Sequence, residues 1–119
     1  MPYVDGFVLA VPKDRLEDYK AMARLGGEVW MGHGALSYVE CIADDVPYGE
    51  LTSFPRAVQA TEDEVVVFSW VTYASRQARD EIMAKVMADE RLKDYMQNMP
   101  FDGKRMIFGG FEAFVQHGS

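Results

Sequence analysis

The chain has 119 residues, of which 49% are hydrophobic, and these values are typical of one globular domain rather than a disordered chain. Its formal net charge is −7. The basic residues are scattered among acids, so we expect no nucleic-acid binding, which requires a concentrated basic face. The apolar run at residues 65–68 is far too short to span a bilayer, and residues 1–5 lack a signal-peptide pattern. One cysteine excludes an internal disulfide framework, so we expect a cytoplasmic protein. Together with the length of the chain, these features predict one domain over residues 1–119 with no membrane partner.

The first two elements are a strand and a long helix. Residues 3–11 are rich in β-branched and aromatic residues and predict a strand, with Asp5 on a face that is otherwise apolar. Apolar residues at helical spacing predict a helix over about residues 13–30. Gly26 and Gly27 lie inside this helix, where each glycine costs about 1 kcal/mol relative to alanine. The glycine pair therefore indicates either close packing on a neighbour or a break in the helix.

Two more strands flank the longest irregular stretch of the chain. Residues 36–42 alternate well enough for a strand and place Glu40 on a mostly apolar face. Residues 43–64 contain prolines, acids and hydroxyls, and a connection of this length is usually functional or mobile. Residues 65–72 form the clearest strand, and its continuous apolar character indicates cover on both faces.

The C-terminal part predicts a second helix and a last strand. Ser75 is placed to cap the helix, and residues 89–97 predict a further helical turn or two. Residues 105–115 predict the strand. Gly109 and Gly110 inside it indicate a bulge, or a place where another group approaches the backbone closely.

This β-α-β-β-α-β order predicts an α+β domain of the ferredoxin-like type. We expect a four-stranded antiparallel sheet with both main helices on one face. The strands are apolar on both sides, whereas two helices can cover only one. An uncovered apolar face of that size would be a sticky patch, so we expect a second copy of the chain to cover it in a two-fold homodimer.

The element order and the expected pairing resemble the dimeric α+β barrel superfamily. That group includes cofactor-free monooxygenases that form quinones, isomerases of small lactones and relatives that handle haem. A closer resemblance is to the uncharacterised bacterial YbaA-like family, and it covers nearly the whole chain. Its most specific motif is Pro-Phe-Asp-Gly-Lys-Arg-Met-Ile at residues 100–107. The resemblance implies a ferredoxin-like dimer and no established activity. The residues that carry it are 3–7, 34–36, 52–55, 67–70, 75–76, 79–80, 100–107 and 109–112.

Three residues are candidates for proton transfer: His33, Glu40 and Asp5. His33 lies between two glycines at the end of the first helix and is either a general acid or base, or a helix-capping loop residue. Asp5 and Glu40 are proton carriers if they face the cleft between sheet and helices. If they face the dimer seam, we expect them to pair with Arg56 or Arg105, because a buried carboxylate needs a partner.

The candidate ligand-binding residues are aromatic side chains and one arginine. Arg105 follows Phe101 and Asp102, and its planar fork either binds a ligand carboxylate or carbonyl, or pairs with Asp102 or Glu112. Aromatic residues on strands either line an apolar pocket or are plain core. The candidates for the pocket wall are Trp70, Phe68, Tyr38, Phe101 and Phe111.

We therefore expect a small protein that binds or transforms a hydrophobic, aromatic or carbonyl-bearing compound. No cysteine and histidine residues have metal-ligand spacing and no nucleotide fingerprint occurs, so we expect no metal or other cofactor. Proton transfer, or oxidation of an activated substrate by O2, is the expected chemistry. The alternative is a non-catalytic interaction module that contacts a protein partner through its acidic 44–64 segment or a sheet edge.

Overall fold

The computed structural model describes residues 2–118 and contains one four-stranded sheet. All strand pairs are antiparallel, and the order across the sheet is β2-β3-β1-β4. This confirms the predicted ferredoxin-like arrangement, with the first and third strands in the centre. The strands are β1 (Tyr3–Pro12), β2 (Ser37–Ile42), β3 (Glu64–Tyr73) and β4 (Ile107–Glu112).

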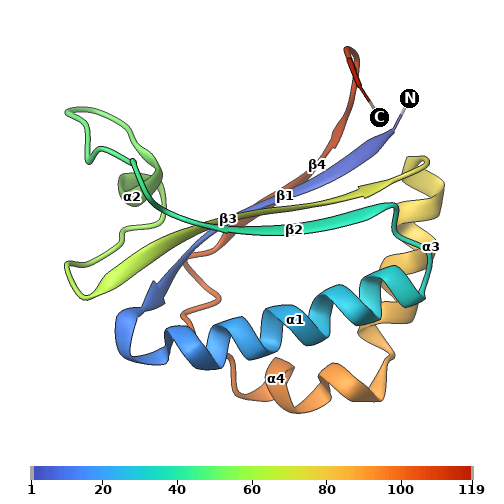
Figure 1. Cartoon of the computed structure of the whole chain (residues 1–119), viewed down its shortest axis with the longest axis horizontal. Coiled ribbons are helices and arrows are strands. Elements are labelled where there is room, and N and C mark those ends of the chain that lie inside the picture. Colours follow the sequence, from blue (N-terminus) through green and yellow to red (C-terminus); the bar gives the residue numbers. More distant parts are fainter. Residues whose placement is uncertain (1, 119) are drawn as a thin grey trace.

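The helices lie mainly on one side of this sheet. Figure 1 shows α1, α3 and α4 below the sheet, while the short α2 and its loop lie at one end of the opposite side. Within residues 2–118, no helix combines the length and the apolar character that crossing a bilayer requires. The helical elements are η1 (Lys13–Arg15), α1 (Leu16–Gly32), α2 (Phe54–Ala57), α3 (Arg76–Met87), η2 (Glu90–Leu92) and α4 (Lys93–Gln97).

The helix starts follow from local chemistry. The turn after Pro12 is a 3-10 helix, so regular α1 begins at Leu16 rather than at residue 13 and continues to Gly32. The predicted cap of α3 is confirmed, because the backbone N–H of Ala78 donates to Ser75 Oγ at 3.1 Å. Ser53 caps α2 in the same way, and this short helix is the one helical piece in the stretch predicted to be irregular.

The main core lies between the sheet and the helices. One cluster of buried side chains joins the middle of β3 to α1 and α3, and includes Val29, Val71, Tyr73 and Ile82. A second cluster joins β1 to the start of α1. These two clusters bury the helix side of the sheet and fix α1 diagonally across it (Figure 1).

The other side of the sheet, which we call the open face, is covered only in part. Val58, from the loop after α2, packs on Val8, Ala10 and Val66 at one end. Beyond this cover the strands still carry large apolar side chains, and Phe111 is 64% exposed. The prediction that the strands are apolar on both faces is therefore confirmed.

The two glycines of β4 mark a close approach and not a bulge. The register with β1 is continuous, with Gly109 opposite Gly6 and Gly110 opposite Asp5. A Cβ atom at Gly110 would lie 2.6 Å from Cε2 of Tyr3 and 2.8 Å from a terminal nitrogen of Arg79. The absence of a side chain at residue 110 thus makes room for these two side chains.

Candidate functional site

A hollow of about 170 Å³, which we call the inner hollow, lies between the helix side of the sheet and helices α1, α3 and α4. Its wall is mostly aromatic rings and methionine thioethers. Met87, Met96 and Met99 line it and are also solvent-exposed, so they form its rim. An apolar hollow with few polar groups is the usual form of a small-molecule site.

Glu40 on β2 is the one carboxylate among the described residues that line the inner hollow. The hydroxyl of Tyr19 on α1 donates to Glu40 Oε1 at 2.6 Å, and the hydroxyl of Tyr38 donates to Oε2 at 2.7 Å. Both carboxylate oxygens act as acceptors, which is the behaviour of an ionised carboxylate. The site therefore consists of a charged group held by two phenols against an apolar wall.

Gly26 and Gly27 explain how the Tyr38 ring reaches this position. A Cβ atom at Gly26 would lie 2.7 Å from Tyr38 Oη, and one at Gly27 would lie 3.2 Å from Tyr38 Cδ1. Of the two alternatives that the sequence left open, close packing is correct, because α1 continues without a break through both residues. The glycine pair thus lets the tyrosine lie against the helix and point its hydroxyl at Glu40.

The two phenols remain hydrogen-bond donors at neutral pH. Burial raises the pKa of Tyr19 far above its ordinary value, and the nearby charge of Glu40 raises it further. Burial and then the charge of Glu40 also raise the pKa of Tyr38. Neither phenol can act as a base, so among the described residues that line the inner hollow Glu40 alone can accept a proton.

A second groove gives access to the same carboxylate from outside. This outer groove, of about 230 Å³, runs between α1 and β2. Its wall includes Lys20 and Arg24 on α1, and it shares Tyr19 and Glu40 with the inner hollow. Glu40 therefore lies where the two spaces meet.

Asp5 also faces the helices, but it lies outside the inner hollow. Its Oδ2 accepts a hydrogen bond from the Tyr73 hydroxyl at 2.9 Å, and its Oδ1 lies 3.6 Å from Nη1 of Arg79. Asp5 is only 5% exposed. Both predicted acids thus face the cleft side, and the partner of Asp5 is Arg79 rather than Arg56 or Arg105.

His33 is separate from the inner hollow and occupies the C-cap of α1. Its Nε2 lies 2.8 Å from Oδ2 of Asp89, which also binds the guanidinium of Arg91. The hydrogen bonds from Arg91, followed by the one to His33, hold the pKa of Asp89 well below its usual range. His33 thus joins the end of α1 to the segment before η2.

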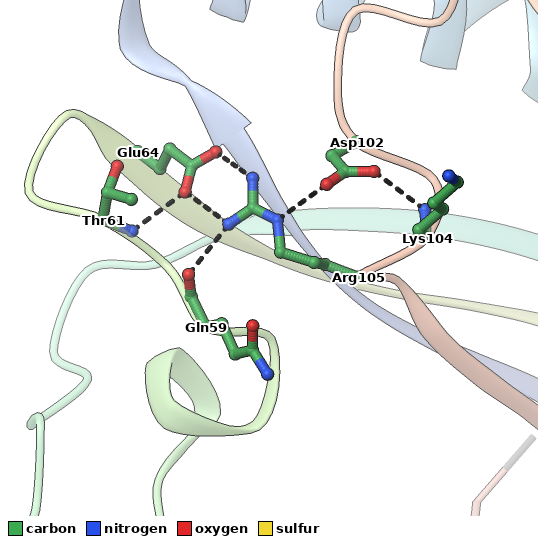
Figure 2. Close-up of polar contacts among 6 residues, drawn as sticks. All are labelled: Gln59, Thr61, Glu64, Asp102, Lys104 and Arg105. Carbon is green, nitrogen blue, oxygen red and sulfur yellow. Dashed lines mark hydrogen bonds and ion pairs between the residues drawn. The ribbon is translucent and has the colours of Figure 1, made fainter.

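Arg105 is the centre of a polar cluster that Figure 2 shows. Its terminal nitrogens bind both oxygens of Glu64, at 2.9 and 2.6 Å, and its Nε binds Asp102 at 3.0 Å. It also donates to the backbone carbonyl of Gln59 at 2.8 Å. The hydrogen bonds from Arg105 lower the pKa of Glu64 to about 2. Arg105 thus forms the expected intramolecular pair with Asp102. Its second carboxylate partner is Glu64 and not Glu112.

This cluster positions one wall of the inner hollow. Arg105 and Asp102 fix the turn before β4, and Phe101 precedes Asp102 in that turn. The ring of Phe101 lies edge-on against Tyr19, with the ring centroids 5.7 Å apart. Phe101 and Tyr38 therefore line the inner hollow, whereas Arg105 acts at a distance from it.

The remaining predicted aromatics lie on or across the sheet. Phe68, Phe111 and Trp70 line a shallow hollow of about 740 Å³ on the open face, where the rings of Phe68 and Trp70 lie edge-on with centroids 5.7 Å apart. The structure thus brings together Glu40, Tyr38 and Phe101 at the inner hollow. It places Phe68, Trp70 and Phe111 on the opposite side of the sheet.

Sequence comparison gives the family. A family model described as "Protein of unknown function (DUF1428)" matches residues 2–103. The chain belongs to this family. A relative, "Uncharacterized protein YbaA" of Escherichia coli strain K12, is 51% identical to this DUF1428 chain over 115 residues, which is 97% of the chain and 98% of YbaA.

Solved structures share the fold of the DUF1428 chain. Rv0793 from Mycobacterium tuberculosis matches with a TM-score of 0.63 at 13% identity, over 99% of this chain and 100% of that one. A protein described as "Putative antibiotic biosynthesis monooxygenase", from Nitrosomonas europaea, gives 0.62 at 13% identity, over 98% and 94%. A dimeric ferredoxin-like protein from an uncultured marine organism gives 0.52 at 12% identity, over 100% of both chains. At these identities the likeness concerns the fold alone.

Two features of the DUF1428 site were not predicted from its sequence. Tyr19 was assigned to the apolar stripe of the first helix, and the methionines of the rim were not singled out. A signal for Tyr19 was present, because an acid on an apolar strand face needs a donor from the helix that covers it. Tyrosine is the residue of that stripe that combines an apolar ring with a hydroxyl.

Proposed function

We propose that the chain binds a small apolar compound with an aromatic ring in the inner hollow and needs no cofactor to do so. Glu40 is the group that the polar part of the ligand meets. The observation that carries the proposal is a carboxylate held at 2.6 and 2.7 Å by two phenols inside an otherwise apolar hollow. A charged group in such a place is costly, and functional sites are where proteins retain such groups.

The size of the hollow supports a ligand of about one ring. An apolar cavity of about 150 Å³ in an engineered protein holds benzene, and the inner hollow measures about 170 Å³. The methionines of the rim add adaptability, because an unbranched thioether side chain can adjust to ligands of different shape. Any chemistry in this hollow would be proton transfer to Glu40, since the two phenols are held as donors.

Trp30 provides the test, because its ring lines the inner hollow, whereas the ring of Trp70 lies on the open face against Phe68. Single-ring compounds such as benzyl alcohol are screened by thermal shift and then titrated by tryptophan emission. A ligand present at a concentration of a hundred times its Kd raises the free energy of unfolding by about 2.7 kcal/mol. We expect a higher Tm together with a change in emission. If no small compound raises the Tm, or if stabilising compounds leave the emission unchanged, the inner hollow is not the site, and an interaction module becomes the better explanation.

The homodimer is a second part of this proposal, and the open face supports it. Phe68, Ile107 and Phe111 are exposed there around the shallow hollow of about 740 Å³. A second copy of the sheet is the simplest cover for such a face. Light scattering should give twice the chain mass of 13.5 kDa, and Phe111→Glu should give the monomer. Met87→Glu, an equally drastic change on the helix layer, is the control and should remain dimeric; a wild-type monomer would refute the pairing.

A further inference from the structure

The charges around the inner hollow are unbalanced. Glu40 lines it, but no lysine, arginine or histidine does among residues 2–118. Lys20 and Arg24 line only the outer groove, and neither lies within ion-pair distance of Glu40; Lys20 instead pairs with Glu17 at 3.3 Å. The chain as a whole carries a formal charge of −7. On the side of the inner hollow, the carboxylate therefore has hydrogen-bond donors but no positive charge.

Hydrogen bonds already made at Glu40 restrict what a ligand can offer. The hydroxyls of Tyr19 and Tyr38 are both donated to the carboxylate, so they are not free to bind a ligand carbonyl. A ligand anion would meet the negative charge of Glu40 without a compensating group. A donor with a positive charge is the complement of this site, because charge-assisted hydrogen bonds to a carboxylate are the strong ones.

The wall of the inner hollow also favours a cation. The rings of Trp30 and Tyr38 lie with centroids 5.7 Å apart, and those of Tyr19 and Phe101 are at the same separation. Aromatic faces attract cations through their quadrupole, most strongly when water is excluded. The remaining wall includes several thioether side chains, which are soft and polarisable. A carboxylate among aromatic rings is the combination that recognises organic ammonium groups.

We infer that the ligand of the inner hollow is an apolar amine in its ammonium form, with the nitrogen donating to Glu40 and the hydrocarbon part lying among the aromatic and thioether side chains. This inference rests on the proposed function and narrows its ligand class. The hollow of about 170 Å³ sets the size at about one ring with a short arm. Tyr19 and Tyr38 position the carboxylate, and the ammonium supplies the charge that the protein does not.

The test compares three probes of matched shape: benzylamine, benzyl alcohol and benzoate. Binding is measured by calorimetry and by tryptophan emission on the full chain at neutral pH. We expect benzylamine to bind at least about tenfold more tightly than benzyl alcohol, because the ammonium adds an attraction between opposite charges to the hydrogen bond that the alcohol also donates. Benzoate should bind most weakly.

Two variants test whether the preference for the amine depends on Glu40. Glu40→Gln should remove the preference for the amine while the alcohol still binds, and Glu50→Gln, an exposed acid with the same change in charge, should retain it. The wild-type comparison needs no variant, so it decides the matter even if Glu40→Gln fails to fold. Equal affinities for amine and alcohol, or a preference that survives Glu40→Gln, would overturn the amine inference and leave the binding site intact. No binding of any probe, with no change in emission, would count against the proposed function itself.

Discussion

Replacing Gly26 with alanine tests whether the glycine exists to accommodate Tyr38. The added Cβ would lie 2.7 Å from Tyr38 Oη, which is too close for an undisturbed ring. The ring is confined on its other side by Trp30, so we expect the hydroxyl to leave Glu40. Gly32 is the matched control, because a Cβ atom there would meet nothing within 4 Å.

The magnitudes can be worked out from these contacts. Loss of a hydrogen bond to a charged group costs about 1.5–3 kcal/mol, and alanine in place of a helical glycine returns about 1 kcal/mol. Gly26→Ala should therefore destabilise the fold by about 0.5–2 kcal/mol. Gly32→Ala retains only the gain in helix propensity, about 0.5 kcal/mol at a helix end. The two variants should then differ by roughly 5–10 °C in Tm for a domain of this size.

Urea denaturation followed by far-ultraviolet circular dichroism gives both free energies of unfolding. Tryptophan emission adds a local measurement, because Trp30 contacts the ring that is displaced. We expect a changed emission spectrum for Gly26→Ala and an unchanged one for Gly32→Ala. If Gly26→Ala is as stable as Gly32→Ala and its emission is normal, then Tyr38 does not require the glycine and the proposed construction of the site is wrong.

Two further variants test the buried polar groups. Glu64 has a pKa of about 2 in the folded chain against an ordinary 4.5. Its contribution to the free energy of unfolding is therefore complete above about pH 5 and is lost as the pH falls toward 2. Solvent screening limits this contribution to about 1–2 kcal/mol. In urea denaturation, the free energy of unfolding of Glu64→Gln should change less with pH between about pH 5 and 3 than that of wild type. If the two proteins show the same dependence on pH, the pairing with Arg105 is contradicted. Tyr73→Phe leaves Asp5 without its hydroxyl donor and should cost about 1–3 kcal/mol, whereas the exposed Tyr48→Phe should cost almost nothing; equal stabilities would refute the role of this bond.

Local patterns predicted most of the fold. Strand alternation, the helical spacing of apolar residues and the serine before α3 each depend on residues close in sequence, and the structure agrees with them to within a few positions. The ferredoxin-like class followed from the order of the elements. The extent of α1 was predicted less accurately, because a proline at a strand end does not distinguish a 3-10 turn from an α-helical one.

The candidate site could be predicted only in part, because its contacts join distant segments. Glu40 stood out as an acid on an apolar strand face, but its partner Tyr19 is 21 residues away and depends on how α1 crosses β2. The same holds for Arg105 and Glu64, which are 41 residues apart. The carboxylate partner of His33 is Asp89, 56 residues away, which could not be assigned to it from sequence.

The position of β2 at the edge of the sheet has a consequence for motion. β2 is hydrogen-bonded to β3 alone, whereas the central strands β1 and β3 each have two neighbours. Strands with less backbone support open locally at lower free energy, so we expect the amides of residues 37–42 to exchange with deuterium faster than those of β1. Such opening would separate β2 from α1 and widen the passage to Glu40 without disturbing the centre of the sheet. Glu40 and Tyr38 are thus carried by the strand that opens more readily, and the rest of the aromatic wall by the neighbouring elements.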